Sequence, residues 1–276
     1  MKKLFVVELK HCLDSVECKM FFLLLLIANM TSYFLCVNND YGISYQFIRS
    51  ANENFILQGT EAAFIPYLLV VFFPMYSTII WSLSRRKEEQ DNSAILMIQR
   101  VGVKKYLYCK VFVIILVVFL INVIPLLVNL LFCHLTYPIK GFDSAWAEPD
   151  YLIGIFSYDA ENFIDMVRLQ NPTLYNIIYI FNFGIFGVGV ALLGFGISFF
   201  EKMEHYYYVK IPIVIFMLYT MQNVIFSILG LGKYTIQTYI TTNSQGNIIS
   251  YCCTIIILYF IDFILIQRGI KKYELL

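Results

Sequence analysis

The chain has little charge for its length. Of its 276 residues, 20 are Lys or Arg and 19 are Asp or Glu, so only 14% are charged, whereas a soluble globular domain has about 25%. Hydrophobic residues make up 59%, and the mean hydropathy is +0.71. These proportions exclude an ordinary soluble domain, because such a domain is closer to half apolar.

The sequence also lacks the spacing of metal-binding residues. Its three histidines are dispersed at His11, His134 and His205, and its seven cysteines have neither metal-ligand spacing nor the pattern of a secreted disulfide framework. Cys36 and Cys133 are both expected near the outer ends of membrane spans and could pair. Cysteines in apolar helices are, however, more often small packing residues.

Catalytic motifs are missing as well. The nearest approach to a phosphate-binding loop, SILGLGKY at 227–234, has Ser227 where the pattern needs Gly and Tyr234 where it needs Ser or Thr. The serine-hydrolase pattern fails because Phe200 stands where its second glycine is required. We therefore expect that the chain is not an enzyme and binds no metal, cofactor or nucleic acid.

What the sequence has instead is long apolar blocks. A membrane-spanning helix needs about 20 apolar residues at a rise of about 1.5 Å each. None of the blocks could be a soluble core helix without exposing apolar surface all round. Together they predict an all-α integral membrane protein, with a single transmembrane domain over 1–276 and six transmembrane helices at about 20–37, 63–83, 110–133, 175–200, 211–230 and 247–267.

Lys and Arg are distributed unequally between the two sides of these spans. The two termini and the loops after the second and fourth spans together hold 16 of them, and the other side holds only Arg49, Lys140, Arg168 and Lys233. Because basic loops stay in the cytoplasm, we expect both termini to be cytoplasmic and the protein to lie in the cell membrane. The outer loops carry nine acidic residues and so have a net charge of −5.

The first segment, 1–19, has the pattern of an amphipathic helix. Charged side chains lie opposite an apolar set that recurs at three- and four-residue spacing and comprises Phe5, Leu9, Cys12, Leu13 and Val16. With Lys residues near its start, this helix is expected to lie in the inner interface among the membrane lipids. The alternative is a plain cytoplasmic extension of the first span.

Prolines and long loops predict the irregular parts of the molecule. Pro66 and Pro74 in the second span and Pro125 in the third each remove a helix hydrogen bond and favour kinks. The outer segments 38–62 and 134–174 are too long for turns. The second of them, a large extracellular loop, contains a helix pattern, and we expect a small helix pair that rests on the membrane surface.

The fourth span carries a stripe of small residues. They are separated by three and four positions and therefore share one helix face; the stripe comprises Gly184, Gly187, Ala191, Gly194 and Ser198. Helices in lipid associate by close approach of their backbones through small residues. We expect this stripe to pack against another helix, within the subunit or across a dimer.

One charged residue, Asp262, lies inside a span. Such a charge costs about 2.5–3.5 kcal/mol at a helix centre on insertion scales, so it is a candidate functional residue. It precedes Arg268 by six residues, about 9 Å along a helix, and could reach a polar partner near the inner end. A structural hydrogen-bonding role is favoured over an ion-coupling role.

Residues 84–109 form a polar cytoplasmic loop with an apolar centre. Asp91 or one of the two residues after it can cap a short helix at 92–101, and Gly102 follows as a stop. So short a helix is unstable alone in water. Its apolar face must therefore pack on the protein interior or on a partner; that face comprises Ala94, Ile95, Ile98 and Val101.

Here the sequence resembles the permease subunits of ABC exporters of the ABC-2 type. Those subunits have six spans, an amphipathic N-terminal helix and, between spans two and three, an acidic residue, a short helix, an arginine and a tyrosine-lysine pair. This chain has Asp91, the helix 92–101, Arg100, Tyr106 and Lys110 in that order, with Asn92-Ser93 where a glycine is usual. In addition, residues 171–200 resemble the fourth-span region of permeases from Gram-positive bacteria.

The resemblance implies that the 92–101 helix is a coupling helix that sits in a groove on a separate cytoplasmic ABC ATPase. That partner would bind ATP and Mg²⁺, and a second permease subunit, identical or related, would complete the pathway. The cargo would be an amphipathic molecule such as a peptide, a lipid or a drug. Two other hypotheses stay open. The chain could be an ion-coupled secondary transporter that uses Asp262, or a non-transporting membrane scaffold or sensor subunit.

Overall fold

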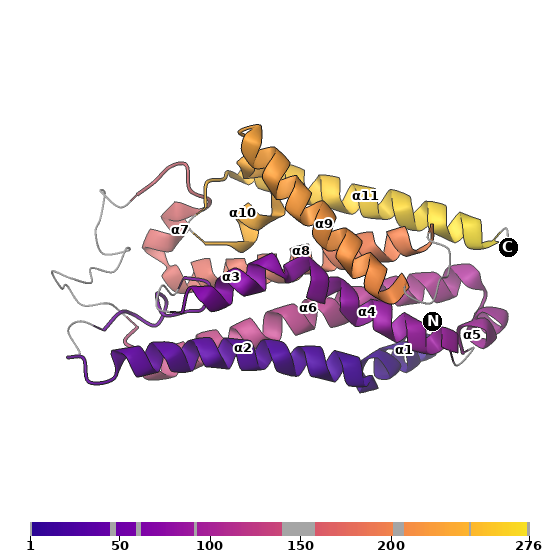
Figure 1. Ribbon diagram of the computed structural model, residues 1–276, viewed down its shortest axis with the longest axis horizontal. Helices are drawn as coiled ribbons and strands as arrows, with labels where there is room; N and C mark the ends of the chain where they lie inside the picture. Colours follow the sequence, from indigo (N-terminus) through magenta and orange to yellow (C-terminus); the bar gives the residue numbers. More distant parts are fainter. Residues whose placement is uncertain are drawn as a thin grey trace.

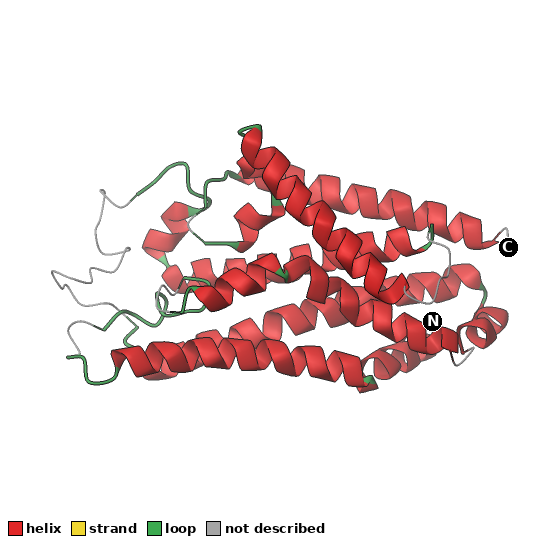
Figure 2. Ribbon diagram, in the orientation of Figure 1, coloured by secondary structure: helices red, strands yellow, loops and turns green. Residues whose placement is uncertain are grey.

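The computed structural model describes residues 2–44, 48–58, 62–90, 93–139, 158–200, 207–242 and 244–274. Over these residues the chain is an elongated bundle of helices without a β-strand (Figure 2). The only pairing of extended backbone among them is one isolated antiparallel bridge between Asn162 and Gln245. The all-helical class predicted from the sequence is therefore confirmed.

Five helices are long and apolar enough to cross a membrane, which makes the chain a multi-pass α-helical membrane protein. Their bounds are α2 Val16–Asp40, α6 Val103–Thr136, α8 Pro172–Ser198, α9 Tyr207–Ile228 and α11 Ile248–Glu274. Each overlaps one of the expected spans almost completely. α2 and α6 extend beyond both ends of theirs, whereas α8 and α9 end two residues earlier than expected and α11 begins one residue later.

The segment expected to be the second span is two helices. α3 (Phe64–Val71) and α4 (Phe73–Gln90) meet at Phe72 with a bend of 52°. The cause is Pro74, which has no N–H for the carbonyl of Val70 one turn earlier. The hydroxyl of Tyr219 on α9 donates to that carbonyl at 3.4 Å instead.

The other two prolines produce no break. Pro66 lies in the first turn of α3, where the N–H would have no helical partner, and Pro125 lies inside the continuous α6. α4 also remains helical to Gln90, so the first part of the predicted 84–109 loop is helix.

α8 is the central helix, and 72% of its most apolar window is buried. A methyl group on Gly184 would meet Val123 of α6 at 2.6 Å, and one on Gly194 would meet Thr78 of α4 at 3.1 Å. Gly187 lies where α4 and α6 meet, and Ala191 and Ser198 are buried. The small-residue stripe thus packs against helices of this same chain.

A second face of α8, which the sequence did not single out, packs against α11. A methyl group on Gly196 would meet the Cβ of Leu265 at 2.7 Å, and Gly189 faces Leu258 of the same helix. α8 therefore approaches its neighbours closely on two sides through glycine.

The remaining short elements gather at the two ends of the bundle (Figure 1). α1 (Lys2–Asp14) and α5 (Ser93–Val101) lie at the end that carries both chain termini, which we call the terminal end. The opposite end carries α7 (Asp165–Gln170), the 3-10 helix η3 (Gly232–Tyr234) and α10 (Ile236–Ile240). Of the expected outer helix pair, the described residues contain only the short α7, and residues 140–157 lie outside them.

Candidate functional sites at the two ends of the bundle

The short helix α5 forms a sharp corner with α6. It ends at Val101, and Gly102 follows with a φ of +88°, a left-handed conformation that glycine adopts without strain. The N–H of Gly102 donates to the carbonyl of Ile98 at 2.8 Å, and α6 begins at the next residue. The predicted stop is therefore present, and one residue joins the two helices. Of the three expected cap residues, Asp91 and Asn92 lie outside the described residues, and Ser93 is the first residue of α5.

The protein's own core covers part of the apolar face of α5. Ala94 and Ile98 are partly buried against the main hydrophobic cluster, as is Met97. Leu96, by contrast, is 55% exposed, and Arg100 is exposed beside it. Of the predicted coupling set, Ala94 and Ile98 therefore pack inward, Val101 is partly buried and Arg100 faces outward; the side chain of Ile95 lies outside the description.

α1 packs along α6 through an ion pair. The Nζ atom of Lys110 lies 3.7 Å from a carboxylate oxygen of Glu8, and the two side chains are only 11% and 9% exposed. Of the apolar face predicted from the sequence, Cys12 is buried, whereas Leu13 and Val16 are exposed. The charged residue Glu8 thus lies on the packed side, a position that periodicity alone did not reveal.

Asp262 lies on α11 with 2% of its surface exposed. Neither of its carboxylate oxygens has a hydrogen-bond partner among the described residues, so the hydrogen bond that a structural role requires is not found there. One turn earlier, Tyr259 donates to the carbonyl of Ile185 on α8 at 2.8 Å. α11 is thus attached to α8 by a neighbour of Asp262, and the acid itself faces Gly189 of α8.

At the opposite end, residues 48–58 form a non-helical segment inside the bundle, which we call the buried loop. It belongs to the outer segment expected at 38–62. Six of its residues are almost completely buried: Ser50, Ala51, Asn52, Asn54, Phe55 and Ile56. Irregular backbone at membrane depth is tolerated only where protein or water satisfies its polar groups.

Asparagines from the spanning helices satisfy that backbone. The Oδ1 atom of Asn129 on α6 accepts from the N–H of Ile56 at 3.1 Å, and its Nδ2 atom donates to the carbonyl of Asn29 on α2 at 2.8 Å. The Nδ2 atom of Asn176 on α8 donates to the carbonyl of Asn52 at 3.1 Å. Asn129 precedes the end of α6 by seven residues, about 10 Å along the helix. The buried loop therefore extends into the bundle and is held between three of its helices.

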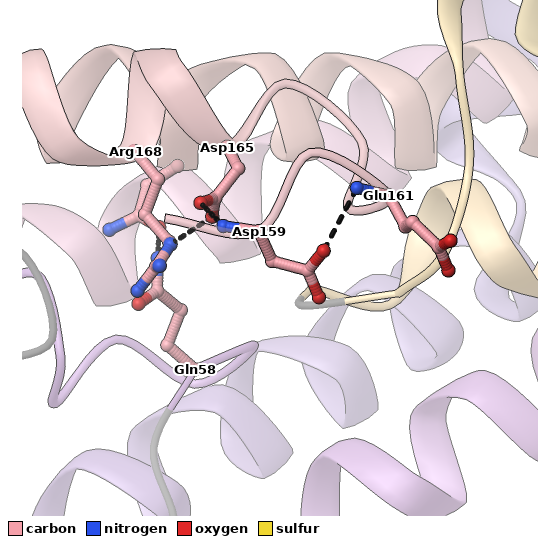
Figure 3. A network of polar contacts seen from close by, with 6 residues as sticks. Gln58, Asp159, Glu161, Asp165 and Arg168 are labelled. Carbon is pink, nitrogen blue, oxygen red and sulfur yellow. Dashed lines mark hydrogen bonds and ion pairs between the residues drawn. The ribbon is translucent and has the colours of Figure 1, made fainter. Parts of the chain in front are cut away.

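A compact turn beside α7 covers the same end (Figure 3). Arg168 pairs with Asp165 at 2.5 Å, and the second carboxylate oxygen of Asp165 accepts from the N–H of Asp159 at 2.9 Å. Both paired side chains are buried. Ile164, just before α7, has a φ of +52°, which is unusual for a branched side chain and indicates local strain. Arg168, which the sequence placed among the outer basic residues, is thus part of a buried ion pair.

The sequence contained a signal for the buried loop. Asn29, Asn129 and Asn176 all stand inside apolar blocks, and a polar side chain in a span usually has a polar partner. For Asn129 and Asn176 a partner is the backbone of the buried loop, which is far away in sequence, whereas the Nδ2 atom of Asn29 donates to the carbonyl of Leu25 in its own helix. No local pattern could identify the buried loop as a partner. Among the described residues, no group of His, Cys, Asp and Glu could hold a metal ion.

Comparisons with known proteins give no relative: no family model, no curated protein and no solved structure matches the chain.

Replacing Lys110 with Met is expected to destabilise the fold by about 3–5 kcal/mol, because it removes the cation that pairs with the buried Glu8 carboxylate. Replacing both Glu8 and Lys110 with Met should recover most of that loss, since two apolar side chains of similar size fill the same space. Equilibrium unfolding of the purified variants in detergent measures the difference. Equal destabilisation by the single and the double replacement would contradict this account.

Asn129→Leu should loosen the buried loop, because the N–H of Ile56 loses its acceptor, a loss of about 1–3 kcal/mol. Hydrogen–deuterium exchange of the amides in 50–57 should then become about tenfold faster or more. Asn38→Leu is the matched control. Asn38 is exposed on α2, and among the described residues its side chain forms no hydrogen bond with the buried loop. Unchanged exchange in Asn129→Leu would show that other contacts hold the loop.

Proposed function

We propose that this chain is the membrane subunit of an ATP-driven exporter of the ABC-2 type. The observation that carries the proposal is the corner at the terminal end, where the short helix α5 is joined by Gly102 alone to the long helix α6. Five helices that are long and apolar enough to span a membrane support it, and the bent pair α3–α4 would be a sixth span. Six spans would place both termini and α5 on one side, the cytoplasmic side by the distribution of Lys and Arg.

The proposed coupling surface is the outward side of α5. Leu96 is an exposed apolar residue, and Arg100 stands one turn further along the same short helix. These two residues would enter a groove of a cytoplasmic ATPase, while Ala94 and Ile98 keep the helix attached to its own subunit. This proposal differs from the expectation from the sequence, in which the apolar candidates for the partner surface did not include Leu96 and were Ala94, Ile95, Ile98 and Val101.

Force applied to α5 would reach the spans through two rigid connections. The first is the one-residue joint at Gly102, which passes a rotation of α5 directly to α6. The second is α1, which the buried pair of Glu8 and Lys110 attaches to α6 near the same corner. α6 packs in turn against the central helix α8, so a displacement at the terminal end would be transmitted to the middle of the bundle.

The energy would come from outside this chain. It has no phosphate-binding loop, so ATP and Mg²⁺ would be bound by separate ATPase subunits. A second permease subunit would complete the pathway, and α2, α9 and α11, whose apolar windows are at most 28% buried, have surface available for it and for lipid. The cargo would be an amphipathic molecule, such as a peptide, a lipid or a drug.

Leu96→Asp is expected to abolish the binding of the ATPase without unfolding the chain, because Leu96 is exposed and the change places a charge in an apolar contact. Tagged chain is purified in mild detergent, together with an ATPase encoded beside it, and ATP hydrolysis in the eluate is measured. We expect a loss of at least about tenfold in Leu96→Asp, as for an interface residue that contributes more than about 1.4 kcal/mol. Leu135→Asp, an exposed leucine at the opposite end of α6, should retain the activity. Wild-type chain that retains no ATPase would overturn the proposal.

A second candidate function, an ion-coupled carrier, is favoured by one observation. Asp262 is a buried acid in a spanning helix whose two oxygens have no described partner, and acids in such positions often bind protons or ions in transporters. Asp262→Asn distinguishes the two functions in vesicles that contain the complex. Transport that needs a proton gradient and stops in this variant would favour the carrier; transport that needs ATP and continues would favour the exporter.

A further inference from the structure

A polar pocket of about 730 Å³ opens at the end of the bundle opposite the termini. Two parts of the chain that are far apart in sequence form it. One is the turn before α7, and the other runs from the end of α9 through η3 and α10 to the residues that precede α11. Its lining is polar side chains and glycines, with one acid and one base: Ala160, Glu161, Ser227, Gly230, Gly232, Lys233, Thr238, Gln245, Gly246 and Asn247.

Hydrogen bonds to main-chain carbonyls hold the walls of this pocket in place. The N–H of Gly246 donates to the carbonyl of Glu161 at 2.8 Å. The hydroxyl of Tyr239 donates to the carbonyl of Lys233 at 2.6 Å. The hydroxyl of Thr238 donates to the carbonyl of Gly232 at 2.8 Å. Glu161 and Lys233 are thus fixed through their backbones, and their side chains are not needed for this framework.

The two charged side chains are available to a ligand. Figure 3 shows the carboxylate of Glu161 directed away from the cluster of Asp159, Asp165 and Arg168. The ammonium group of Lys233 lies 5.6 Å from the ring centre of Tyr234. Neither charge forms an ion pair with another described residue. The pocket therefore offers a ligand one negative and one positive group that do not pair with each other.

The pocket stands at the boundary of the apolar surface of the bundle. Ile228, at the end of α9, is 79% exposed, and Ile249, at the start of α11, is 75% exposed. Leu229 and Ile248 beside them are also exposed. In a multi-pass membrane protein such side chains contact the acyl chains of lipids. A ligand in the pocket would thus be in contact with the hydrocarbon edge of the bilayer.

We propose that this pocket binds the headgroup of a zwitterionic phospholipid of the ethanolamine type. Its primary ammonium group donates hydrogen bonds to Glu161, and its phosphate accepts them from Lys233. Its acyl chains lie along Ile228 and Ile249. A phosphatidylglycerol headgroup has the phosphate but no cation for Glu161, so the pocket should distinguish the two lipids. The inference rests on the membrane character of the chain and not on the proposed exporter function.

Native mass spectrometry of the purified chain tests this assignment, with phosphatidylethanolamine and phosphatidylglycerol offered in equal amounts. Wild-type chain should retain phosphatidylethanolamine about tenfold better, the value of one hydrogen bond between charged groups. Glu161→Gln should abolish the preference, because the ammonium group loses its partner. Lys233→Gln should weaken the retention of both lipids. Both variants should fold, since the framework uses only the carbonyl groups of these residues.

Asp159→Asn is the matched control. Asp159 is also an exposed acid of this turn but does not line the pocket, and Asn keeps the oxygen that accepts from the N–H of Glu161. The control should show the wild-type preference, since the overall charge alone is altered. Equal retention of the two lipids by wild-type chain overturns the proposal, as does a preference that persists in Glu161→Gln. If the chain retains neither lipid but binds a dipeptide such as glycylglycine, and Glu161→Gln abolishes that binding, the pocket would be a peptide site. That result would also overturn the proposal.

Discussion

The fold depends on the requirement that backbone polar groups within a membrane find partners inside the protein. Regular helices meet this requirement by themselves, and two departures from helix among the described residues meet it with the help of neighbouring helices. At the α3–α4 bend, Tyr219 supplies the hydrogen bond that Pro74 removes. At the buried loop, Asn129 and Asn176 supply the bonds that a helix would have made internally. Each irregularity exists because a side chain from a neighbouring helix compensates for it.

Both irregular places lie around α8, and the glycines of α8 explain why. Close approach on two faces brings α4 and α6 to one side and α11 to the other. Because α8 is so closely surrounded, its Asn176 lies within reach of the buried loop. The helices beside α8 are positioned by close backbone contact and not by long side chains. The centre of the molecule is therefore tightly packed, and the exposed polar and charged features are found at its ends.

The two ends differ in what they present. The terminal end has the corner at Gly102, an exposed Leu96 and a buried ion pair between Glu8 and Lys110. The opposite end has the buried loop, the Asp165–Arg168 pair and a polar pocket beside apolar surface. Asp262 belongs to neither end, and its buried carboxylate has no hydrogen-bond partner among the residues that the structure describes.

The amino-acid sequence by itself determined the helical membrane class, the approximate positions of the spans, the helix stop at Gly102 and the packing face of Gly184, Gly187 and Gly194. These properties follow from local composition and periodicity, because a span is long and apolar wherever it occurs. The tertiary structure alone decided that Ile98 packs inward while Leu96 faces out, that Glu8 pairs with Lys110, and that residues 48–58 enter the bundle. Each of these depends on contacts between segments distant in the chain, and no local pattern encodes which distant group satisfies a given charge or carbonyl.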